Sequence, residues 1–540
     1  LMEALELLFP PIINEIRRYP EPLQHLYFFY RHLWGPFAQG PAGIVAYQDR
    51  TIMASVDALG LRPLWLIQNK DAYAISSEPG IFRIKEMTSD PKPLAPGEKL
   101  AIRIEDSLTG PSVEIIPYED IQQEVLQRTL SRYPRMTSPI RPIPASGGLS
   151  VEDSDGADSA LPTAPQSEFR VSKARLAAWG WEIDDVRMIE QEASSGAEPI
   201  GSLGYDGPLA ALTEGNANLS DYFKETVAVV TNPAIDRERE IEHFSTRVVL
   251  GKRPPAFATP ASIHPQVELR IPLMLGGHHG PSPVDENTYR IMARRLETVL
   301  YEDFCNAFQE EVHHIALSMS VHESLPDALD RLAEDACRAV ESGCEFLILS
   351  DEYRPPEDQL PIEAALAVAK IDVALKKYPV AEGEVNLRRR CSIIVRAGSL
   401  RNLHDLVVHL GLGADAAVPY QMYEVAAESH GAAGIENLVH AMQKGMEKVI
   451  STIGIHEFRG YDRLFMAIGL RDDVARTMNV LNCCGSEEIG LGWEQLVEQA
   501  KQRASLLRSE DPKARPERAF RIYPRIWKLA GDIARGTGTY

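Results

Sequence analysis

Two pairs of adjacent histidines are the residues whose types suggest metal chemistry most directly. His278 and His279 lie in a glycine-rich loop, and His313 and His314 lie in a run that we predict to be helical. Zinc sites use three or four ligands that converge on the ion, whereas adjacent histidines point in diverging directions. No carboxylate or third histidine follows at a standard offset. We therefore expect no metal site and assign no metal ligand.

Acidic residues beside predicted strands are the next candidates for chemistry. Asp351 and Asp415 lie at strand termini, where α/β proteins form ligand sites. A role in a turn or a helix cap is the simpler interpretation, and we favour it over catalysis. The pair Asp184-Asp185 predicts a helix that begins at 183–186 rather than a metal site.

A polar pair and a glycine pair could also suggest a site. Arg62 and Glu78 lie beside glycine-rich turns, and we expect them to form a buried pair or support a turn rather than contact a substrate. Gly411 and Gly413 follow a predicted helix and precede a strand. A dinucleotide-binding loop needs the opposite order, so we assign no cofactor-binding residue.

The six cysteines are sparse and form no C-x-x-C pair. Their positions are Cys305, Cys337, Cys344, Cys391, Cys483 and Cys484. Adjacent cysteines are poorly placed for an unstrained disulfide, so a reducing compartment fits the chain best. We assign no catalytic residue from this set.

Composition narrows the function classes. The chain has 540 residues, of which 44% are apolar and 25% are charged, and its formal net charge is −21. Phosphate backbones are bound by clustered Lys and Arg, so this acidic balance argues against nucleic acid as a general partner. No apolar run approaches eighteen residues and no signal-peptide pattern opens the chain, so we expect a cytoplasmic protein without a membrane partner.

The first third of the chain predicts a helical start followed by short strands. Residues 1 to about 30 show helical spacing, and the aromatic run Leu26–Tyr30 is expected in a core. A β meander follows, with a polar turn at 48–50. Its expected strands are 43–47, 51–56, 63–67, 72–77 and 99–104. Residues 137–168 have the Ser-, Pro- and Gly-rich composition of a linker.

From about 285 to 500, helices and apolar strands alternate, which is typical of α/β proteins. Predicted strands lie at 314–320, 344–349, 392–395 and 416–419, between predicted helices at 289–301, 325–342, 361–376, 400–410 and 435–450. Short glycine turns connect them. The pattern predicts a mostly parallel sheet that is covered on both faces.

Several motifs of this region resemble the glutamate synthase large subunit. Glu198–Ala210 and Asp221–Glu240 are similar to the family's E-P-I-G-S-M-G and D-Y-F-K…N-P-x-I-D segments. Leu347–Asp351 and Gly411–Tyr420 are similar to I-L-S-D-R and G-Y-G-A-D-A-I-N-P-Y. The family's histidine-rich helix is replaced here by Ala367–Asp372, so no role of those histidines is carried over.

The N-terminal part resembles the C-terminal part of the family's class II glutamine amidotransferase domain. Gly40–Ile44 is similar to D-G-P-A-x-I, and Asp57 with Gly60–Pro63 is similar to D-R-N-G-L-R-P. Ala58-Leu59 replaces Arg-Asn, which is closer to amidophosphoribosyltransferases. The family uses an N-terminal cysteine as nucleophile, but the first cysteine here is Cys305, so the resemblance yields no catalytic residue.

The expected architecture is α/β and α+β multidomain. We predict a partial N-terminal-nucleophile amidotransferase fold and then a Rossmann-like α/β central domain with a mostly parallel sheet. The expected divisions are an amidotransferase part at 1–120, a linker at 121–169, a connector at 170–284, the central domain at 285–500 and a run towards a flavin domain at 501–540.

The resemblance implies a segment of a glutamate synthase, which makes two glutamates from glutamine, 2-oxoglutarate and a reductant. This segment would link the glutaminase and FMN reductase sites and contribute to the ammonia path. Glutamine and 2-oxoglutarate are the implied parent substrates, while FMN and an iron–sulfur cluster belong to the parent protein and not to this chain. Both ends look cut, and we expect the chain alone to be inactive.

Two other functions remain open. The chain could be a silent scaffold that binds a separate FMN barrel domain or subunit. It could also be a small-ligand-binding α/β module that uses the strand ends near Asp351 and Asp415. The sequence does not identify the electron donor or the oligomeric state.

Overall fold

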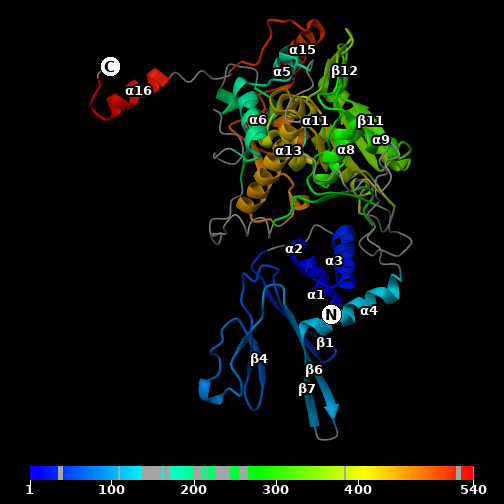
Figure 1. The fold of residues 1–540 in the computed structure, drawn as a ribbon, viewed down its shortest axis with the longest axis vertical. Coiled ribbons are helices and arrows are strands. Elements are labelled where there is room, and N and C mark those ends of the chain that lie inside the picture. The colour runs from blue at the N-terminus through cyan, green and yellow to red at the C-terminus, as the bar shows by residue number, and fades with distance from the viewer. Residues whose placement is uncertain are drawn as a thin grey trace.

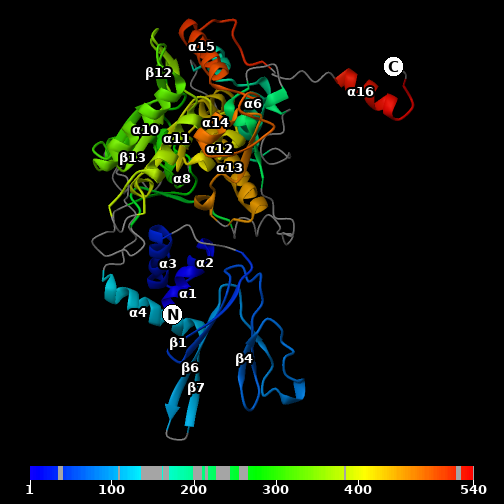
Figure 2. The same cartoon turned by 180° about the vertical axis from the view of Figure 1, so that it is seen from behind.

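The structure is a computed structural model that describes residues 1–34, 40–107, 110–134, 161, 169–198, 209–212, 217–226, 244–254, 266–381, 385–455, 457–517 and 524–538 (Figure 1). The elements up to α4 form a smaller body, and those from α5 to α15 form a larger one. The two lie one above the other in both views (Figures 1 and 2). The expected linker, apart from its first residues and Leu161, and most of the segments 199–208 and 227–243 lie outside the described residues.

The smaller body pairs a helical layer with two antiparallel sheets. Its helices are α1 (Met2–Leu8), α2 (Ile13–Ile16), α3 (Glu21–Trp34), η1 (Ile84–Glu86) and α4 (Tyr118–Arg132). Its strands are β1 (Gly43–Gln48), β2 (Thr51–Val56), β3 (Trp65–Gln68), β4 (Tyr73–Ser76), β5 (Lys92–Pro93), β6 (Lys99–Ser107) and β7 (Gly110–Ile116). The sheets have the orders β1-β2-β6-β7 and β4-β3-β5. The predicted strands are therefore present, but they divide between two sheets, and β2 pairs with β6 instead of continuing a single meander to β3.

Local sequence explains the hairpin and the core of this body. Asp49 and Arg50 both have positive φ, at 46° and 62°, which suits a two-residue turn between right-twisted strands. Tyr27, Phe29 and Tyr30 of α3 are buried, as predicted, and pack with residues of α4. The core extends to Tyr133, which is beyond the position 120 expected as the end of this part.

The larger body is built on a four-stranded parallel sheet. Its strands are β11 (Val312–Ala316), β13 (Phe346–Ser350), β15 (Ser392–Arg396) and β16 (Ala416–Val418), in the order β11-β13-β15-β16. Between them run α10 (Leu325–Glu341), α11 (Ala364–Lys377) and α12 (Leu403–Leu412), close to the predicted helices. The expected parallel α/β sheet is confirmed. Its strand order is consecutive, whereas a Rossmann sheet reverses its strand order once.

Both faces of the parallel sheet are covered, as predicted. Leu347, Leu349 and Val395 face the main helical core, while Phe346 and Ile348 face a second core. That second core is closed by β9 (Val248–Leu250), β10 (Val267–Leu269) and α9 (Tyr301–Ala307). Strands that are buried on both faces read as continuous apolar runs, as Phe346–Leu349 does.

The remaining elements surround this sheet, except α16 (Pro524–Ala534), which stands apart from the larger body in both views (Figures 1 and 2). They are α5 (Lys173–Ala178), α6 (Ile183–Ser195), η3 (Ala210–Leu212), η4 (Leu219–Tyr222), β8 (Phe223–Glu225), α8 (Glu286–Arg295), β12 (Ser318–Ser320), β14 (Gln359–Pro361), η6 (Leu387–Arg390), α13 (Tyr420–Ile453), η7 (Phe458–Gly460), β17 (Phe465–Ile468), α14 (Asp472–Met478), β18 (Leu481–Cys483), α15 (Trp493–Ser509) and α16 (Pro524–Ala534). Helix α13 bends at His430-Gly431, where φ leaves the helical region. No helix among the described residues is both long and apolar enough to cross a membrane.

Candidate functional site

The carboxyl ends of the parallel strands meet at Asp351, directly after β13. This carboxylate accepts a hydrogen bond from the backbone N–H of Gly398 at 2.6 Å and from the Tyr420 hydroxyl at 2.9 Å. His279 Nε2 lies 2.8 Å from its other oxygen. Since Asp351 is buried and joins the turns after β13 and β15, it has the geometry of a turn-supporting residue.

The two histidines of the pair at 278–279 diverge, as the sequence indicates. His278 Nδ1 is 3.1 Å from Glu424, and its Nε2 is 2.7 Å from the Tyr289 hydroxyl. His279 turns instead to Asp351. The described residues include no group of three or more His, Cys, Asp or Glu side chains placed to hold a metal ion.

Asp415 lies at the opposite edge of the sheet from Asp351. It precedes β16, so it stands at the amino edge, where its Oδ2 accepts from the Ile393 N–H at 2.8 Å and from Arg388 at 2.7 Å. The two aspartates therefore cannot share one ligand site at the strand ends, which was the alternative left open, and the favoured turn role fits the contacts of both. Only Asp351 is at the carboxyl edge, because strand direction separates a residue before a strand from one after it.

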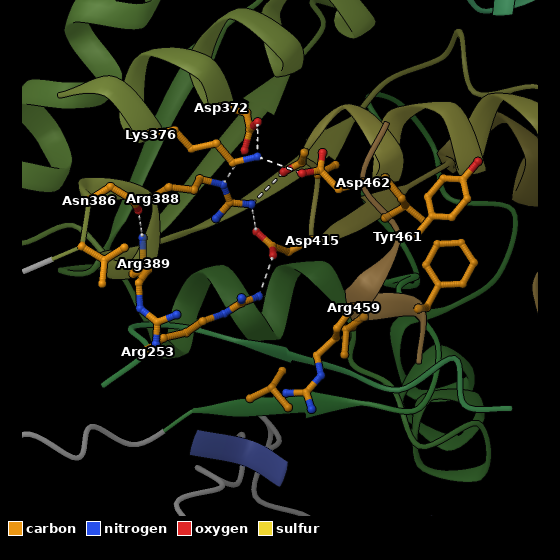
Figure 3. A pocket seen from close by; sticks show the side chains of 17 residues that line it. Arg253, Asp372, Lys376, Asn386, Arg388, Arg389, Asp415, Arg459, Tyr461 and Asp462 are labelled. Carbon is orange, nitrogen blue, oxygen red and sulfur yellow. Dashed lines mark hydrogen bonds and ion pairs between the residues drawn. The ribbon is translucent and has the colours of Figure 1, made fainter. Parts of the chain in front are cut away.

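A cavity of about 430 Å³ opens at this amino edge, and we call it the arginine pocket (Figure 3). It is lined by five cationic side chains, three carboxylates and several apolar or aromatic ones. The lining residues are Val248, Val249, Arg253, Asp372, Lys376, Val385, Asn386, Arg388, Arg389, Leu410, Gly413, Ala414, Asp415, Phe458, Arg459, Tyr461 and Asp462. Its size is within the usual range for small-molecule sites.

Arg388 organises one wall of the arginine pocket. Its guanidinium bonds to Asp372 at 3.0 Å, to Asp415 at 2.7 Å and to the Gly413 carbonyl at 2.7 Å. Asp372 also pairs with Lys376 and Arg463, each at 2.9 Å. Although burial opposes ionisation, these three cations lower the pKa of Asp372, and the two aspartates raise the pKa of Arg388. Both aspartates are thus already paired.

Three further guanidinium groups have weaker pairing within the arginine pocket. Arg253 reaches Asp415 only at 3.6 Å. Arg389 donates to the Pro254 carbonyl at 2.7 Å, while its buried Nε has no hydrogen-bond partner among the described residues. Arg459 donates to Glu457, outside the pocket lining, at 2.9 Å. Such an arrangement is suited to binding an anion.

Burial makes the charged forms of these three arginines less stable than they are in water, and their pKa values are lowered. Burial, with repulsion from Arg388, Arg459 and Arg389, lowers the pKa of Arg253 to about 10 despite the attraction of Asp415. Burial lowers the pKa of Arg459 to about 10 and also lowers that of Arg389. Buried charges without a matched partner raise the free energy of the native state.

The arginine pocket lies beside the contact between the two bodies. Arg459 donates to the backbone carbonyl of Arg31, in α3, at 2.8 Å. Arg31 forms a buried ion pair with Glu457, the residue that Arg459 also contacts. A second ion pair between the bodies, Arg17 with Glu297 at 3.8 Å, is exposed.

The polar residues singled out in the smaller body have structural surroundings. Arg62 and Glu78 are both exposed, so of the two expected roles the buried pair is wrong, while support of a turn stays a prediction. Asp57 is the residue that organises this turn. Its buried carboxylate accepts from the backbone N–H groups of Ala42, Leu59, Leu61 and Arg62 at 3.1 to 3.2 Å.

Two other sequence predictions have clear outcomes. Helix α6 begins at Ile183 with Asp184 and Asp185 in its first turn, as predicted. His313 and His314 lie in strand β11 rather than in a helix. Successive strand side chains point to opposite faces, and His313 pairs with Asp335 at 2.9 Å, so the two rings still diverge.

The glycines at 411 and 413 serve packing. A Cβ at Gly413, where φ is +124°, would lie 2.5 Å from Cγ of Asp372, and one at Gly411 would lie 2.4 Å from the Phe465 ring. Side chains approach the backbone so closely at both positions that only glycine fits. The order of α12 before β16 is the order that the sequence predicts.

The cysteines do not form a site among the described residues. Burial raises the pKa of Cys305 and Cys344 to about 11 and that of Cys391 to about 12, which disfavours the nucleophilic thiolate. Cys483 and Cys484 are exposed neighbours. An iron–sulfur cluster takes four cysteines, and no group of three or more His, Cys, Asp or Glu side chains among the described residues is placed to hold a metal ion.

Sequence reasoning missed the arginine pocket. Its lining comes from positions between 248 and 462, so the sequence order gives little indication of the cluster. One local signal exists, since Arg388-Arg389-Arg390 is a run of three cations in a chain of net charge −21. Such a run at the start of a strand could have indicated an anion site.

Two family models match the chain in series. The model "Glutamine amidotransferases class-II" matches residues 1–129, and "Glutamate synthase central domain" matches residues 174–471. The second covers more than half of the chain. The two matches correspond to the smaller body and to most of the larger one.

Curated relatives agree with the family models. The chain is 27% identical over 500 residues to the glutamate synthase [NADPH] large chain of Bacillus subtilis, covering 88% of this chain and 29% of that protein. It is 26% identical over 501 residues to ferredoxin-dependent glutamate synthase 2 of Synechocystis sp., covering 87% and 29%. The chain thus spans less than a third of the length of these relatives.

Solved structures add a weaker likeness. A mutant flavocytochrome b2 with pyruvate bound aligns with a TM-score of 0.31 and 9% identity, covering 57% of this chain and 84% of that one.

Proposed function

Because the chain belongs to the glutamate synthase family, we propose that it is the segment that joins the glutamine-hydrolysing and flavin-dependent parts of such an enzyme. In the parent reaction, glutamine is hydrolysed, ammonia is passed on, and 2-iminoglutarate is reduced by FMN to glutamate. The observation that supports this role is the serial match to the amidotransferase and central-domain models. Glutamine and 2-oxoglutarate are then the parent substrates, and a cytoplasmic location belongs to the same proposal.

The division of the chain also remains a proposal. We keep the boundaries 170–284, 285–500 and 501–540. We move the end of the first part from 120 to 133, which shortens the linker to 134–169, because α4 packs into that core. The N-terminal-nucleophile type of the first part and the Rossmann-like type of the second are finer proposals. The consecutive strand order weighs against the latter.

We assign FMN and the iron–sulfur cluster to the rest of a glutamate synthase, as the family resemblance implies. Among the described residues no group of three or more His, Cys, Asp or Glu side chains is placed to hold a metal ion, so we propose no ligand of the cluster there. No step of the reaction is therefore assigned to a residue of this chain, and its proposed contribution is to hold two parts in place and contribute to the ammonia path.

Coupling between the parts is the property that tests this proposal. In the complete enzyme, Glu457→Gln weakens the buried contact with Arg31. We expect glutamate formation from glutamine to fall several-fold while formation from free ammonia and glutamine hydrolysis change little. The matched control is Glu487→Gln, an exposed residue paired with Arg476. Equal loss with glutamine and with ammonia would contradict a role in coupling.

The alternative is a catalytically silent scaffold that binds a separate flavin-barrel subunit. The intact mass and N-terminal residue of the native protein distinguish the two functions. A mass well above 60 kDa with an N-terminal cysteine supports the enzyme segment, whereas a mass near 60 kDa with a co-purifying flavoprotein supports the scaffold.

A further inference from the structure

We propose that the arginine pocket binds a small organic compound that carries two negative charges on oxyanion groups. Guanidinium groups form paired hydrogen bonds with carboxylate and phosphate oxygens, so both kinds of oxyanion share the chemistry of this site. The inference uses the pocket alone and does not depend on the parent reaction.

The charges of the lining leave an excess that a dianion would match. Five cationic side chains face three carboxylates, although the whole chain has a net charge of −21. Asp372 and Asp415 already bond to Arg388 at 3.0 and 2.7 Å. Asp462 is 2.8 Å from Arg463, which does not line the pocket, and 3.2 Å from Lys376. Each of the three carboxylates is therefore already paired with Arg388, Arg463 or Lys376.

The unmatched charge resides on Arg253, Arg389 and Arg459. Arg253 is 3.6 Å from its nearest carboxylate, which it shares with Arg388, and the Nε of Arg389 is buried without a described partner. Glu457, the carboxylate partner of Arg459, is shared with Arg31. In Figure 3 these three side chains extend along one side of the cavity, opposite Lys376 and Asp372.

The repulsion among these arginines has a physical consequence. Partial burial removes much of the water around Arg253, whose side chain is 25% exposed, and Arg388, Arg459 and Arg389 repel its charge. An oxyanion between the groups would replace this water and offset the repulsion. A bound anion would therefore reduce the repulsion between the arginine charges, and this gain favours binding.

The shape of the cavity indicates a ligand with an organic body. A volume of about 430 Å³ is larger than a single inorganic anion requires. Val248, Leu410, Phe458 and Tyr461 supply apolar and aromatic walls between the charged groups. We therefore expect a dicarboxylate or a phosphate ester, rather than a free halide or a monocarboxylate.

Isothermal titration calorimetry of the 540-residue chain with succinate and with glycerol phosphate tests the site, with acetate at equal ionic strength as the monoanion control. We expect saturable binding of at least one dianion and none of acetate. Succinate binding alone identifies a dicarboxylate site, and glycerol phosphate binding alone identifies a phosphate site. Failure of both dianions to bind would overturn the proposal.

Two variants locate the binding. Arg253→Gln and Arg389→Gln should each weaken dianion binding about tenfold or more, because each removes a charge-assisted contact. The control Arg476→Gln, an exposed arginine paired with Glu487, should bind as the original chain does. Unchanged affinity in both pocket variants would overturn the assignment.

A measurement on the unaltered chain covers the case in which a variant fails to fold. Phenylglyoxal modifies accessible arginines, and mass spectrometry of peptides reports each rate. The bound dianion should slow modification of Arg253 and Arg389 several-fold and leave Arg476 unchanged. Equal rates with and without the dianion would overturn the proposal.

Discussion

At the residue scale, the buried guanidinium of Arg401 holds the connector to the α/β sheet. Arg401 is 2% exposed and bonds to Asp221 at 2.6 Å and to Asp405 at 2.8 Å. Although burial opposes ionisation, Arg401 helps to lower the pKa of Asp405 to about 2. Since Asp221 belongs to η4 and Asp405 to α12, one side chain joins two elements that are distant in sequence.

Arg401→Met should therefore destabilise the larger body strongly. The substitution keeps an unbranched chain but leaves two carboxylates buried without their cation, and breaking a buried pair costs about 3–5 kcal/mol. Urea unfolding followed by circular dichroism measures the loss. The control is Arg187→Met, whose side chain is 60% exposed and 3.6 Å from Asp184. A surface pair of this kind contributes about 0–1 kcal/mol, so similar losses in both variants would contradict the role of Arg401.

A second residue, Glu192 in α6, should make stability depend on pH. Burial, with repulsion from Glu198, raises the pKa of Glu192 to about 8, from about 4.5 in the unfolded chain. The native state therefore holds one more proton between these values. The stabilisation is complete below about pH 4.5 and is lost as pH rises towards 8, by up to about 1.4 kcal/mol per unit.

Glu192→Gln removes this titration, so the variant should gain stability relative to the original chain as pH rises from 5 to 8. Chemical unfolding at several pH values measures the difference. Glu190→Gln, an exposed position of the same helix, should leave the pH dependence unchanged. Parallel pH curves for the original chain and Glu192→Gln would contradict a raised pKa at this residue.

At the element scale, Gly413, the residue after α12, shapes one wall of the arginine pocket because its backbone lies against Asp372 and Arg388. Gly413 has φ of +124°, and its carbonyl accepts from Arg388. Gly413→Ala should cost about 1–2 kcal/mol for the backbone conformation, plus about 1–3 for overpacking against Asp372. The control is Gly343→Ala after α10, where φ is +110° and nothing lies within 4 Å of the added Cβ. Thermal unfolding should show a larger loss of stability for Gly413→Ala than for Gly343→Ala. Equal losses would mean that overpacking against Asp372 contributes nothing.

Elements were predictable where local pattern decides the structure. The strand at Phe346–Ser350 and the helix at Leu325–Glu341 lie close to the predicted ranges, because a continuous apolar run and a Ser-capped amphipathic run each favour one structure. The sequence supports conflicting predictions for His313-His314, a helical run and a strand that begins at 314, because two polar residues hide the alternation of a short strand. Pairing with β13 decides its structure, and that pairing is not local.

The site was less predictable than its elements. Asp351 and Asp415 each stand beside a strand, but only the direction of the strands shows that they lie at opposite edges. The arginine pocket brings Arg253 and Arg459 together with Arg388, and no local spacing encodes that assembly. Sequence motifs were sufficient for the family, because long stretches of unusual residues identify it without any knowledge of contacts.

At the scale of the whole molecule, the ion pairs Arg31–Glu457 and Arg17–Glu297 connect the bodies among the described residues, and we expect the buried pair to contribute more to the contact. Arg31 is 2% exposed in its pair with Glu457 and also donates to the Pro11 carbonyl, whereas Arg17 is 49% exposed and 3.8 Å from Glu297. Arg31→Met should loosen the contact, because it removes the buried ion pair with Glu457, whose remaining cation, Arg459, belongs to its own body. Calorimetry should then show two separate unfolding transitions, and amide exchange in 21–34 should rise. Arg17→Met should behave as the original chain, since water screens the exposed pair. One shared transition in Arg31→Met would mean that apolar contacts, rather than this ion pair, couple the two bodies.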